Sequence, residues 1–389
     1  MKVLSIETSC DETSIALIKK ESVFEILSNI VASQVKIHEK FGGVYPTLAK
    51  REHQRNLIPV LIETLKKAGF LEKLQNSRLR TQKSKPEVKI LKEILGREKY
   101  LFEKLEKFLK KYQKPEIDAI AVTIGPGLEP CLWVGVNFAR ALGLFWDLPI
   151  IPINHLEAHI FANFLNKDQI MNNKQLFPAI CLIVSGGHTQ LILMRDFGKY
   201  KILGETRDDA AGECFDKTAR ILGLGYPGGP AIEQEAARFK YRESTSVTLP
   251  RPMIHQKNYD FSFSGLKTAV LYDFKKRSSK ERKSKQYIRE MAAEIQQAII
   301  DVLIKKTIRA TKENKVKTII LGGGVAANKE LRRQLREKIE KELPDAYYLK
   351  PDLSLCTDNA AMIGVTAFYH LNERKNWQEI EAKANLRLG

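Results

Sequence analysis

The chain opens with two short apolar runs on either side of a polar turn: residues 3–18 read VLSIETSCDETSIALI. Short runs rich in Val, Ile and Leu around a polar segment are typical of a strand, a turn and a second strand. The pattern recurs at residues 179–194, AICLIVSGGHTQLILM, where the turn contains two glycines. A hairpin that is repeated near the start and in the middle of the chain indicates two similar α/β lobes.

A third strand with a glycine-rich turn is expected further along. Residues 317–321 form an apolar run, residues 322–328 read GGGVAAN, and residues 329–343 have the apolar spacing of an amphipathic helix. Backbone amides in a glycine turn that opens a helix can bind phosphate oxygens. This stretch therefore predicts a phosphate- or nucleotide-binding turn.

Composition narrows the class of protein. The chain has 389 residues, which suits a two-domain α/β enzyme, and its 43% hydrophobic content excludes a disordered chain. Its 64 Lys and Arg exceed its 46 Asp and Glu, and the net charge of +18 leaves two alternatives, a polyanionic partner or a solvated basic surface. The five cysteines form no C-x-x-C pair, and we find neither a signal peptide nor an apolar stretch of about 18 residues, so we expect a cytoplasmic protein without a membrane partner.

Residues 73–114 differ abruptly in composition, with 14 Lys and Arg against 5 Asp and Glu. Apolar residues recur near helical spacing over residues 88–112, so we predict a basic, amphipathic helical insertion after a flexible start. Two interpretations of this insertion are equally open. It is either an arm that faces RNA or a partner protein, or a solvated charged helix that packs on the scaffold. A second basic run, residues 275–289, is expected in a loop that leads into a helix over residues 288–307.

Two histidines stand four residues apart in the segment HLEAH, residues 155–159. On a helix, His155 and His159 lie on one face about one turn apart, where both can bind one metal ion. The glutamate comes third, whereas a zinc peptidase of the H-E-x-x-H type needs it second. Asp358, at the expected start of a helix, is a candidate third ligand, and the alternative is that it only caps that helix.

The turns supply further candidates. The segment SGGHT, residues 185–189, offers backbone amides to phosphate oxygens, although glycine turns also occur without a ligand. Asp11 and Glu12 place two carboxylates in the first turn, where they can handle a metal, a water or a proton, or serve only as turn residues. Gly228-Gly229-Pro230 is predicted as a rigid bend that admits a flat ligand or simply turns the chain.

These segments occur in the order seen in one family. Over nearly its whole length except the basic insertion, the chain resembles the tRNA N6-adenosine threonylcarbamoyltransferases (TsaD), formerly described as O-sialoglycoprotein endopeptidases. The resemblance rests on residues 1–18, GPGL at 125–128, NHLEAH at 154–159, residues 184–190, residues 208–217 with FDK at 215–217, YPGGP at 226–230, FSFSGLK at 261–267, residues 322–328 and CTDNAAM at 356–362.

The resemblance implies an α/β protein of the ASKHA fold (actin, sugar kinase, Hsp70), an actin-like ATPase fold of two similar lobes with a nucleotide cleft between them. The lobes would be residues 1–150, with the basic helical insertion at about 73–114, and residues 151–389, with the phosphate and adenosine loops. The implied activity is an acyl transfer. The threonylcarbamoyl group passes from threonylcarbamoyl-AMP to N6 of adenine 37 in tRNAs that read codons beginning with A, which forms t6A and releases AMP.

Carried over residue by residue, the resemblance also implies a site. His155, His159 and Asp358 would bind one divalent metal per subunit, Fe²⁺ in the first place and Zn²⁺ as the alternative. Asp11, with Glu12 and His188, would handle a proton or orient the substrate. Substrate contacts are implied for Ile183, Val184, Ser185, Gly186 and Gly187 at the adenylate phosphate, for Asp216 and Glu233 at its ribose, and for Gly229 and Asn328 at the adenosine.

The implied partners are tRNA, through its anticodon loop, and TsaB-like and TsaE-like proteins, and the alternative is a protein that acts alone. The chain departs from the family pattern at three places. Residues 129–133, EPCLW, stand where small residues are usual, Glu233 stands where Asp is common, and the insertion has no counterpart.

Three other functions compete with this hypothesis. A zinc metallopeptidase would use the two histidines but leaves the glycine turns unexplained. A small-molecule kinase of the same fold has no need of the His-His-Asp set. A basic RNA-binding module would explain the charge but neither the carboxylates nor the glycine turns.

Overall fold

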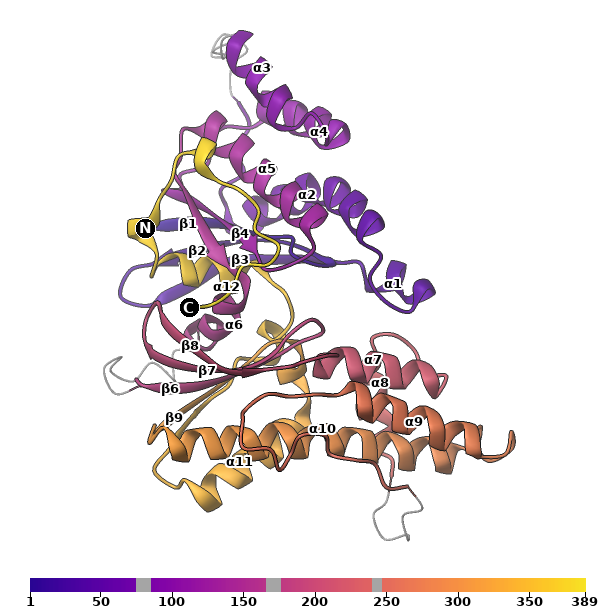
Figure 1. The fold of residues 1–389 in the computed structure, drawn as a ribbon. Helices are drawn as coiled ribbons and strands as arrows, with labels where there is room; N and C mark the ends of the chain where they lie inside the picture. The colour runs from indigo at the N-terminus through magenta and orange to yellow at the C-terminus, as the bar shows by residue number, and fades with distance from the viewer. Residues whose placement is uncertain (75–84, 166–175, 240–246) are drawn as a thin grey trace. The chain divides into compact units, whose positions relative to one another are not determined.

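The computed structural model describes residues 1–74, 85–165, 176–239 and 247–389. Its contacts divide the chain into two units. Unit 1 comprises Met1–Lys36, Val44–Lys167 and Asp358–Arg387, and unit 2 comprises Ile37–Gly43, Asp168–Thr357 and Leu388–Gly389. Each unit contains one five-stranded sheet with helices against it (Figure 1).

Unit 1 has the strand order β3-β2-β1-β4-β5. The strands β1, β2 and β3 are antiparallel, whereas β4 and β5 run parallel to β1. Its elements are β1 (Lys2–Glu7), β2 (Glu12–Lys20), β3 (Phe24–Ser33), α1 (Val35–His38), α2 (Pro46–Ala68), α3 (Lys85–Ile94), α4 (Lys99–Lys111), β4 (Ala119–Gly125), α5 (Glu129–Trp146), β5 (Ile150–Asn154), α6 (His155–Phe161) and α12 (Ala360–Ala367).

Unit 2 repeats this arrangement with the order β10-β9-β6-β7-β8. Here β6, β7 and β8 are antiparallel, and β9 and β10 continue the sheet in parallel, so the prediction of two similar lobes is confirmed. Its elements are β6 (Ala179–Val184), β7 (Thr189–Asp196), β8 (Lys199–Glu205), α7 (Ala211–Ile221), α8 (Gly228–Ala236), α9 (Ser264–Lys276), α10 (Lys285–Glu313), β9 (Thr318–Gly322), α11 (Lys329–Glu342) and β10 (Tyr347–Leu349).

The first hairpin forms because its residues can be buried on both faces. Leu4 and Ile6 point to one face and join the core that α2 and α5 complete, while Ser5 and its partner Ala16 point to the other face. On that second face, α12 packs against β1 and β2. Glu7 follows Ser5 on the same face, so the end of β1 places a carboxylate there.

The helix α12 returns to unit 1 from the C-terminal part of the chain. Ser5 Oγ donates to the carbonyl of Ala360 (2.6 Å), and the amide of Ala360 donates to Ser14 Oγ (2.8 Å). Gly364 faces the sheet so closely that a Cβ there would lie 2.5 Å from Ile18 Cγ1. These contacts explain why the units differ from the predicted lobes of residues 1–150 and 151–389.

The division at residue 150 also falls at the start of β5, which pairs with β4 inside unit 1. The helix α6 follows β5 directly and remains with it. The predicted nucleotide cleft between the lobes stays a prediction.

The basic insertion forms the helices α3 and α4, as predicted, and its expected flexible start lies outside the described residues. Leu101, Leu105 and Phe108 are buried in the same core as α2 and α5, so α4 is a layer of unit 1 (Figure 1). Glu98, just before α4, is 1% exposed, lies 3.8 Å from Lys50 Nζ and accepts from Asn137 Nδ2 (3.4 Å). Burial raises the pKa of this carboxyl.

The unusual segment of residues 129–133 meets the insertion. Trp133 of α5 lines a cavity of about 630 Å³ together with Ile90 and Ile94 of α3. The large side chain of Trp133 therefore lies on the side of α5 that faces α3.

Two predicted loops are partly helical. Lys275 and Lys276 end α9, and Lys285 and Arg289 lie in α10, so only residues 277–284 of the second basic run connect two helices. Gly228-Gly229-Pro230, predicted as a bend, forms the first turn of α8, where proline is tolerated because the first amides of a helix have no partner within it. Within the described ranges, every helix is too short or too polar to cross a membrane.

We expect Gly364→Ala to destabilise the protein by about 1–3 kcal/mol, because the added methyl group overpacks the contact between α12 and β2. Urea unfolding measures this change. Gly265→Ala is the matched control, since a Cβ there meets only Pro252 Cγ at 3.8 Å. Equal midpoints for the two variants would contradict the prediction.

Candidate active site

The helix α6 places the two histidines as the sequence predicted. It begins directly after β5, and Asn154 caps it by accepting from the amides of Leu156 (2.9 Å) and Glu157 (3.3 Å). The rings of His155 and His159 have centroids 4.7 Å apart, and both side chains are buried. The two rings therefore share one face of a short, capped helix.

Asp358 joins the histidines, as expected. Its Oδ1 lies 3.2 Å from His159 Nε2 and 3.6 Å from His155 Nε2. One candidate ligand atom from each of the three residues lies within 4.8 Å of the others. The cap of α12 is not Asp358 but Asn359, whose side chain accepts from the amide of Met362 (3.1 Å), so the capping alternative for Asp358 is wrong.

The donor set fits a divalent metal. Both ring nitrogens of His159 are buried; Nε2 faces Asp358 Oδ1, and Nδ1 makes no hydrogen bond with the described residues, which is costly unless another group meets it. Two imidazoles and one carboxylate suit Fe²⁺ or Zn²⁺ and leave coordination positions for substrate atoms. The metal itself stays a prediction.

Glu7 and Ser9 extend this cluster, and the sequence did not single them out as site residues. Glu7 Oε2 lies 3.1 Å from His155 Nδ1, and Ser9 Oγ lies 3.2 Å from the same nitrogen. Burial opposes ionisation of Glu7, but the positive charge of His155 and the hydrogen bond to it hold the pKa of the carboxyl below its ordinary value. Burial would lower the pKa of His155, but Asp358 and Glu7 raise it to about 9.

Burial lowers the pKa of His159, in contrast to that of His155. A neutral imidazole is the form that binds a metal. The two histidines, although adjacent on one helix face, therefore have different electrostatic surroundings.

The remaining acid of the HLEAH segment lies apart from this cluster. Glu157 Oε2 is 3.0 Å from His370 Nε2, an ion pair that raises the pKa of His370 to about 9 despite burial. A peptidase would need this carboxylate beside the metal to activate water. Its pairing with His370 removes that alternative.

Asp11 lies in the turn between β1 and β2, and Glu12 begins β2, also in unit 1. Asp11 is buried, and Glu12 Oε1 accepts from Ser33 Oγ (3.2 Å). Burial, reinforced by the negative charges of Asp11 and Asp358, raises the pKa of Glu12 well above its ordinary value. A carboxyl group in such a turn can exchange a proton with a bound substrate.

The phosphate-binding candidates lie in unit 2, where three segments meet. The turn after β6 is closed by the amide of Ser185, which donates to the carbonyl of His188 (2.8 Å). Gly186 and Gly187 are exposed, and a Cβ on either would meet open space. Gly212 at the start of α7 lies so near this turn that a Cβ there would be 2.6 Å from the carbonyl of Ser185.

The glycine turn after β9 completes this group. Gly323 has φ of +90°, and a Cβ there would lie 2.4 Å from the carbonyl of Val184, so only glycine fits. Ile183 is buried within β6 and pairs with Gly322, which fixes the two turns next to each other. The sequence predicted both turns but not that they touch.

The other substrate candidates have partners of their own. Asp216 Oδ1 accepts from the amide of Gly228 (2.7 Å), and Glu233 Oε1 accepts from the amide of Lys329 (2.7 Å). The side chain of Asn328 caps α11 and donates to Gln296 Oε1 (2.9 Å). Around Gly229 a Cβ would meet nothing within 4 Å.

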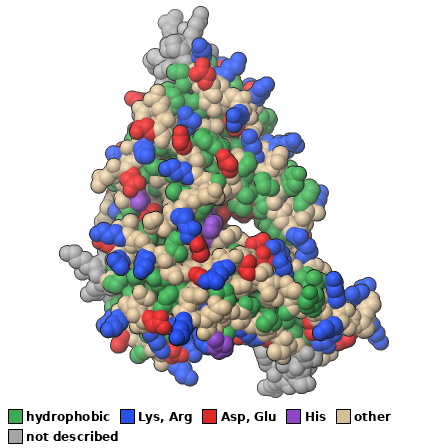
Figure 2. Space-filling view, viewed as in Figure 1, with side chains coloured by type: hydrophobic (Ala, Val, Ile, Leu, Met, Phe, Trp, Pro, Cys, Tyr) green, Lys and Arg blue, Asp and Glu red, His purple; other side chains and the backbone are tan. Residues whose placement is uncertain are grey.

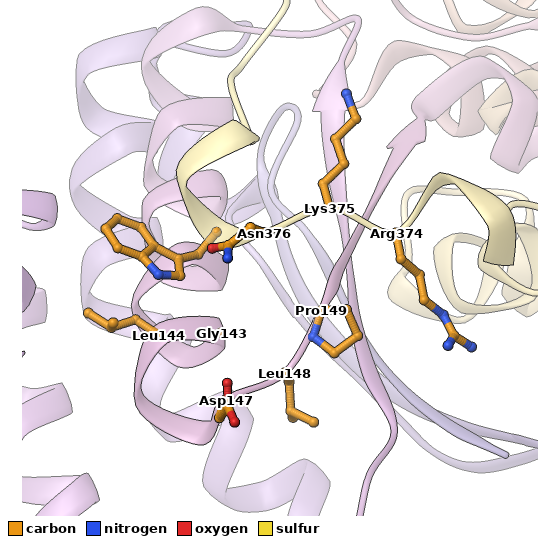
Figure 3. Close-up of a pocket in the computed structure, with 9 residues that line it drawn as sticks. Gly143, Leu144, Asp147, Leu148, Pro149, Arg374, Lys375 and Asn376 are labelled. Atoms are coloured by element: carbon orange, nitrogen blue, oxygen red, sulfur yellow. The ribbon is translucent and has the colours of Figure 1, made fainter.

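Two cavities differ in their relation to the predicted site residues. Figure 3 shows one of about 640 Å³ in unit 1, between the end of α5 and residues 374–377, and none of the predicted site residues lines it. A second cavity of about 350 Å³ in unit 2 is lined by Asp216, Arg220 and Tyr226 with residues 39–42. Of the predicted substrate residues, Asp216 alone lines it.

Two sheets of identical strand order, each with a hairpin turn after its first strand, define an α/β protein of the ASKHA class. A solved structure supports this class: HypF, described as full-length in a phosphate- and nucleotide-bound form, matches with a TM-score of 0.51 at 12% identity, over 96% of this chain and 55% of the HypF chain.

The family follows from the comparison of sequences. The family model of TsaD, tRNA N6-adenosine threonylcarbamoyltransferase, matches residues 25–75 and 100–365. Proteins of that name from Syntrophomonas wolfei and Persephonella marina are 42% and 40% identical, over 96% and 100% of this chain and 93% and 96% of their own. The chain belongs to this family and is a transferase that modifies tRNA. Residues 76–99, which the family model leaves unmatched, fall within the predicted insertion.

We expect His159→Ala to abolish stoichiometric binding of a divalent metal, because it removes one of three convergent donors. Metal content after loading and desalting, measured by mass spectrometry, tests this. His370→Ala is the control, since it deletes a histidine that pairs with Glu157 and Glu373 instead. Equal metal content in both variants would remove His159 from the set of ligands.

Proposed function

We propose that this transferase passes the threonylcarbamoyl group from threonylcarbamoyl-AMP to N6 of adenine 37 in tRNAs that read codons beginning with A, which forms t6A and releases AMP. One observation carries the proposal. In a chain that matches this family of transferases, candidate ligand atoms of His155, His159 and Asp358 lie within 4.8 Å of one another.

The reaction needs little more than positioning and charge stabilisation. A carbon–nitrogen bond forms between the carbamoyl carbon and N6, the bond from that carbon to the phosphate oxygen breaks, and the amine loses one proton. The donor is already activated, so the barrier lies in holding a weak nucleophile against the carbonyl and in stabilising charge on oxygen.

His155, His159 and Asp358 would hold the metal, Fe²⁺ in the first place and Zn²⁺ as the alternative. When bound, such an ion acts as a Lewis acid towards a carbonyl or phosphate oxygen. The protein contributes two buried imidazoles and one partly exposed carboxylate.

Unit 2 would bind the adenylate. The exposed amides of Gly186 and Gly187 suit phosphate oxygens, and the open space at Gly229 suits a flat base. Asp216 and Glu233 are the ribose candidates, although each already accepts a backbone hydrogen bond. The side chain of Asn328, which caps α11 and donates to Gln296, is the candidate for contact with the adenosine.

Asp11 is the candidate acceptor for the proton that leaves N6, with Glu12 and His188 as the further candidates. The raised pKa of Glu12 favours its protonated form, which makes Glu12 a poor base at neutral pH. We further propose a cytoplasmic setting with TsaB-like and TsaE-like partners, which the family resemblance implies.

We expect the purified protein, supplied with threonylcarbamoyl-AMP, tRNA and the TsaB-like and TsaE-like proteins, to yield t6A that mass spectrometry of the digested tRNA detects. His155→Ala should reduce the yield at least about 100-fold, and Asp11→Ala should slow transfer about 10²–10⁴-fold, the usual contribution of a general base. Full transfer by Asp11→Ala would remove Asp11 from the mechanism, and absence of t6A with wild-type protein would refute the proposed reaction.

The basic insertion is proposed to attract tRNA. Besides Lys110, which pairs with Glu106, five lysines are exposed on or just after α4, and Lys and Arg side chains are visible where α3 and α4 lie (Figures 1 and 2). These five are Lys99, Lys104, Lys107, Lys111 and Lys114.

We expect replacement of these five lysines by glutamine to lower the slope of log Kd for tRNA against log salt by about 0.7–0.9 for each phosphate group that a lysine no longer neutralises. Titrations at several salt concentrations measure this slope. A charge-matched control replaces five exposed lysines of unit 2, namely Lys199, Lys201, Lys315, Lys317 and Lys341. An unchanged slope, or an equal fall in both variants, would assign the insertion to another role.

A further inference from the structure

The carboxylate of Glu7 is fully buried at the end of β1, directly after residues 3–6, which are apolar or small. An ionised carboxylate is costly to bury unless donors surround it. Glu7 lies at the carboxyl end of β1. This strand pairs in parallel with β4, and β4 pairs with β5, the strand that leads into α6. Ligand sites of open α/β sheets gather at these ends.

Three donors meet the two oxygens of Glu7. Oε1 accepts from the amide of Ser9 (2.5 Å), while Oε2 accepts from Thr123 Oγ1 (2.6 Å) and lies 3.1 Å from His155 Nδ1. The amide and the hydroxyl fix the carboxylate, so its direction towards the imidazole is set by β1 and β4 together. Thr123 is itself fully buried, so its hydroxyl group is not exposed to bulk solvent.

An ionised carboxylate only accepts hydrogen bonds, so the nitrogen that faces Glu7 must carry a proton. The other nitrogen of the neutral ring, Nε2, then presents its lone pair on the side of His159 and Asp358. His159 differs, because its Nδ1 has no hydrogen-bond partner among the described residues.

We propose that Glu7 is a positioning residue that holds His155 in the tautomer protonated on Nδ1, so that Nε2 is a preformed metal ligand, with Thr123 and the Ser9 amide orienting the carboxylate. This inference rests on the proposed metal role of His155, His159 and Asp358. It assigns a role to two fully buried polar side chains, Glu7 of β1 and Thr123 of β4. Outer carboxylates of this kind change metal affinity about 10–100-fold.

The test is Glu7→Gln, which keeps the size of the side chain but replaces one oxygen by an amide donor. If the amide nitrogen faces His155, Nδ1 must accept and Nε2 must carry the proton, which blocks it as a ligand. We expect the affinity for Co²⁺, measured by competition with a chromophoric chelator, to fall about 10–100-fold. The visible absorption of bound Co²⁺ should change as well.

Thr64→Val is the matched control for removal of a buried hydrogen bond. Thr64 Oγ1 donates to the carbonyl of Ile15 (3.1 Å) in the same unit and touches none of the proposed ligands. If Glu7→Gln weakens Co²⁺ binding by no more than Thr64→Val does, Glu7 is merely structural and the proposal is overturned. A decrease in affinity that clearly exceeds the control supports it, whether or not stability also falls.

This assay uses neither tRNA nor the acyl donor, so it separates two failures. If t6A is not formed while Glu7→Gln weakens Co²⁺ binding, the proposed reaction is wrong and the role of Glu7 stands. If wild-type protein binds no Co²⁺, the role of Glu7 falls together with the metal site.

Discussion

The candidate site depends on the return of the chain to its first sheet at Asp358. The hydrogen bonds of Ala360 with Ser5 and Ser14 hold the start of α12 on β1 and β2, and Gly364 lets the helix approach within contact distance of Ile18. Since Asp358 stands two residues before Ala360, its position relative to α6 is set by this packing. A carboxylate about 200 residues away in sequence from the histidines thereby becomes part of one compact unit.

Features that depend on local sequence could be predicted. The apolar runs around the two turns gave the hairpins of both sheets, and the spacing of His155 and His159 gave their common helix face, because four residues make about one helical turn. The insertion could be predicted as helical from its apolar spacing. Asp358 was a candidate ligand from its place at the expected start of a helix, and the family resemblance joined it with the histidines, because no spacing rule could do so.

Features that depend on pairing across the sheet could not be predicted. Glu7 looked like an ordinary polar residue at the end of a strand, and its contacts with Thr123 and His155 arise only when β4 and β5 lie beside β1. The first turn of α8 was mistaken for a bend, since Gly228-Gly229-Pro230 is a helix breaker within a helix but compatible with its first turn. Likewise, residues 129–133 depart from the family pattern of small residues, and only the structure shows that Trp133 lines a cavity together with residues of α3.

Unit 1 consists of segments that are far apart in the sequence, and this has a consequence for synthesis on the ribosome. The sheet and α6 emerge early, but Asp358 and α12 follow only after Asp168–Thr357, nearly all of unit 2, has been made. At about 5–20 residues per second, this interval lasts roughly 10–40 s. During that time the face of β1 and β2 that α12 later covers has no helix from its own chain to bury it. The nascent protein therefore passes through a stage in which His155 and His159 have been made but Asp358 has not. At that stage chaperones can reach the uncovered face of β1 and β2.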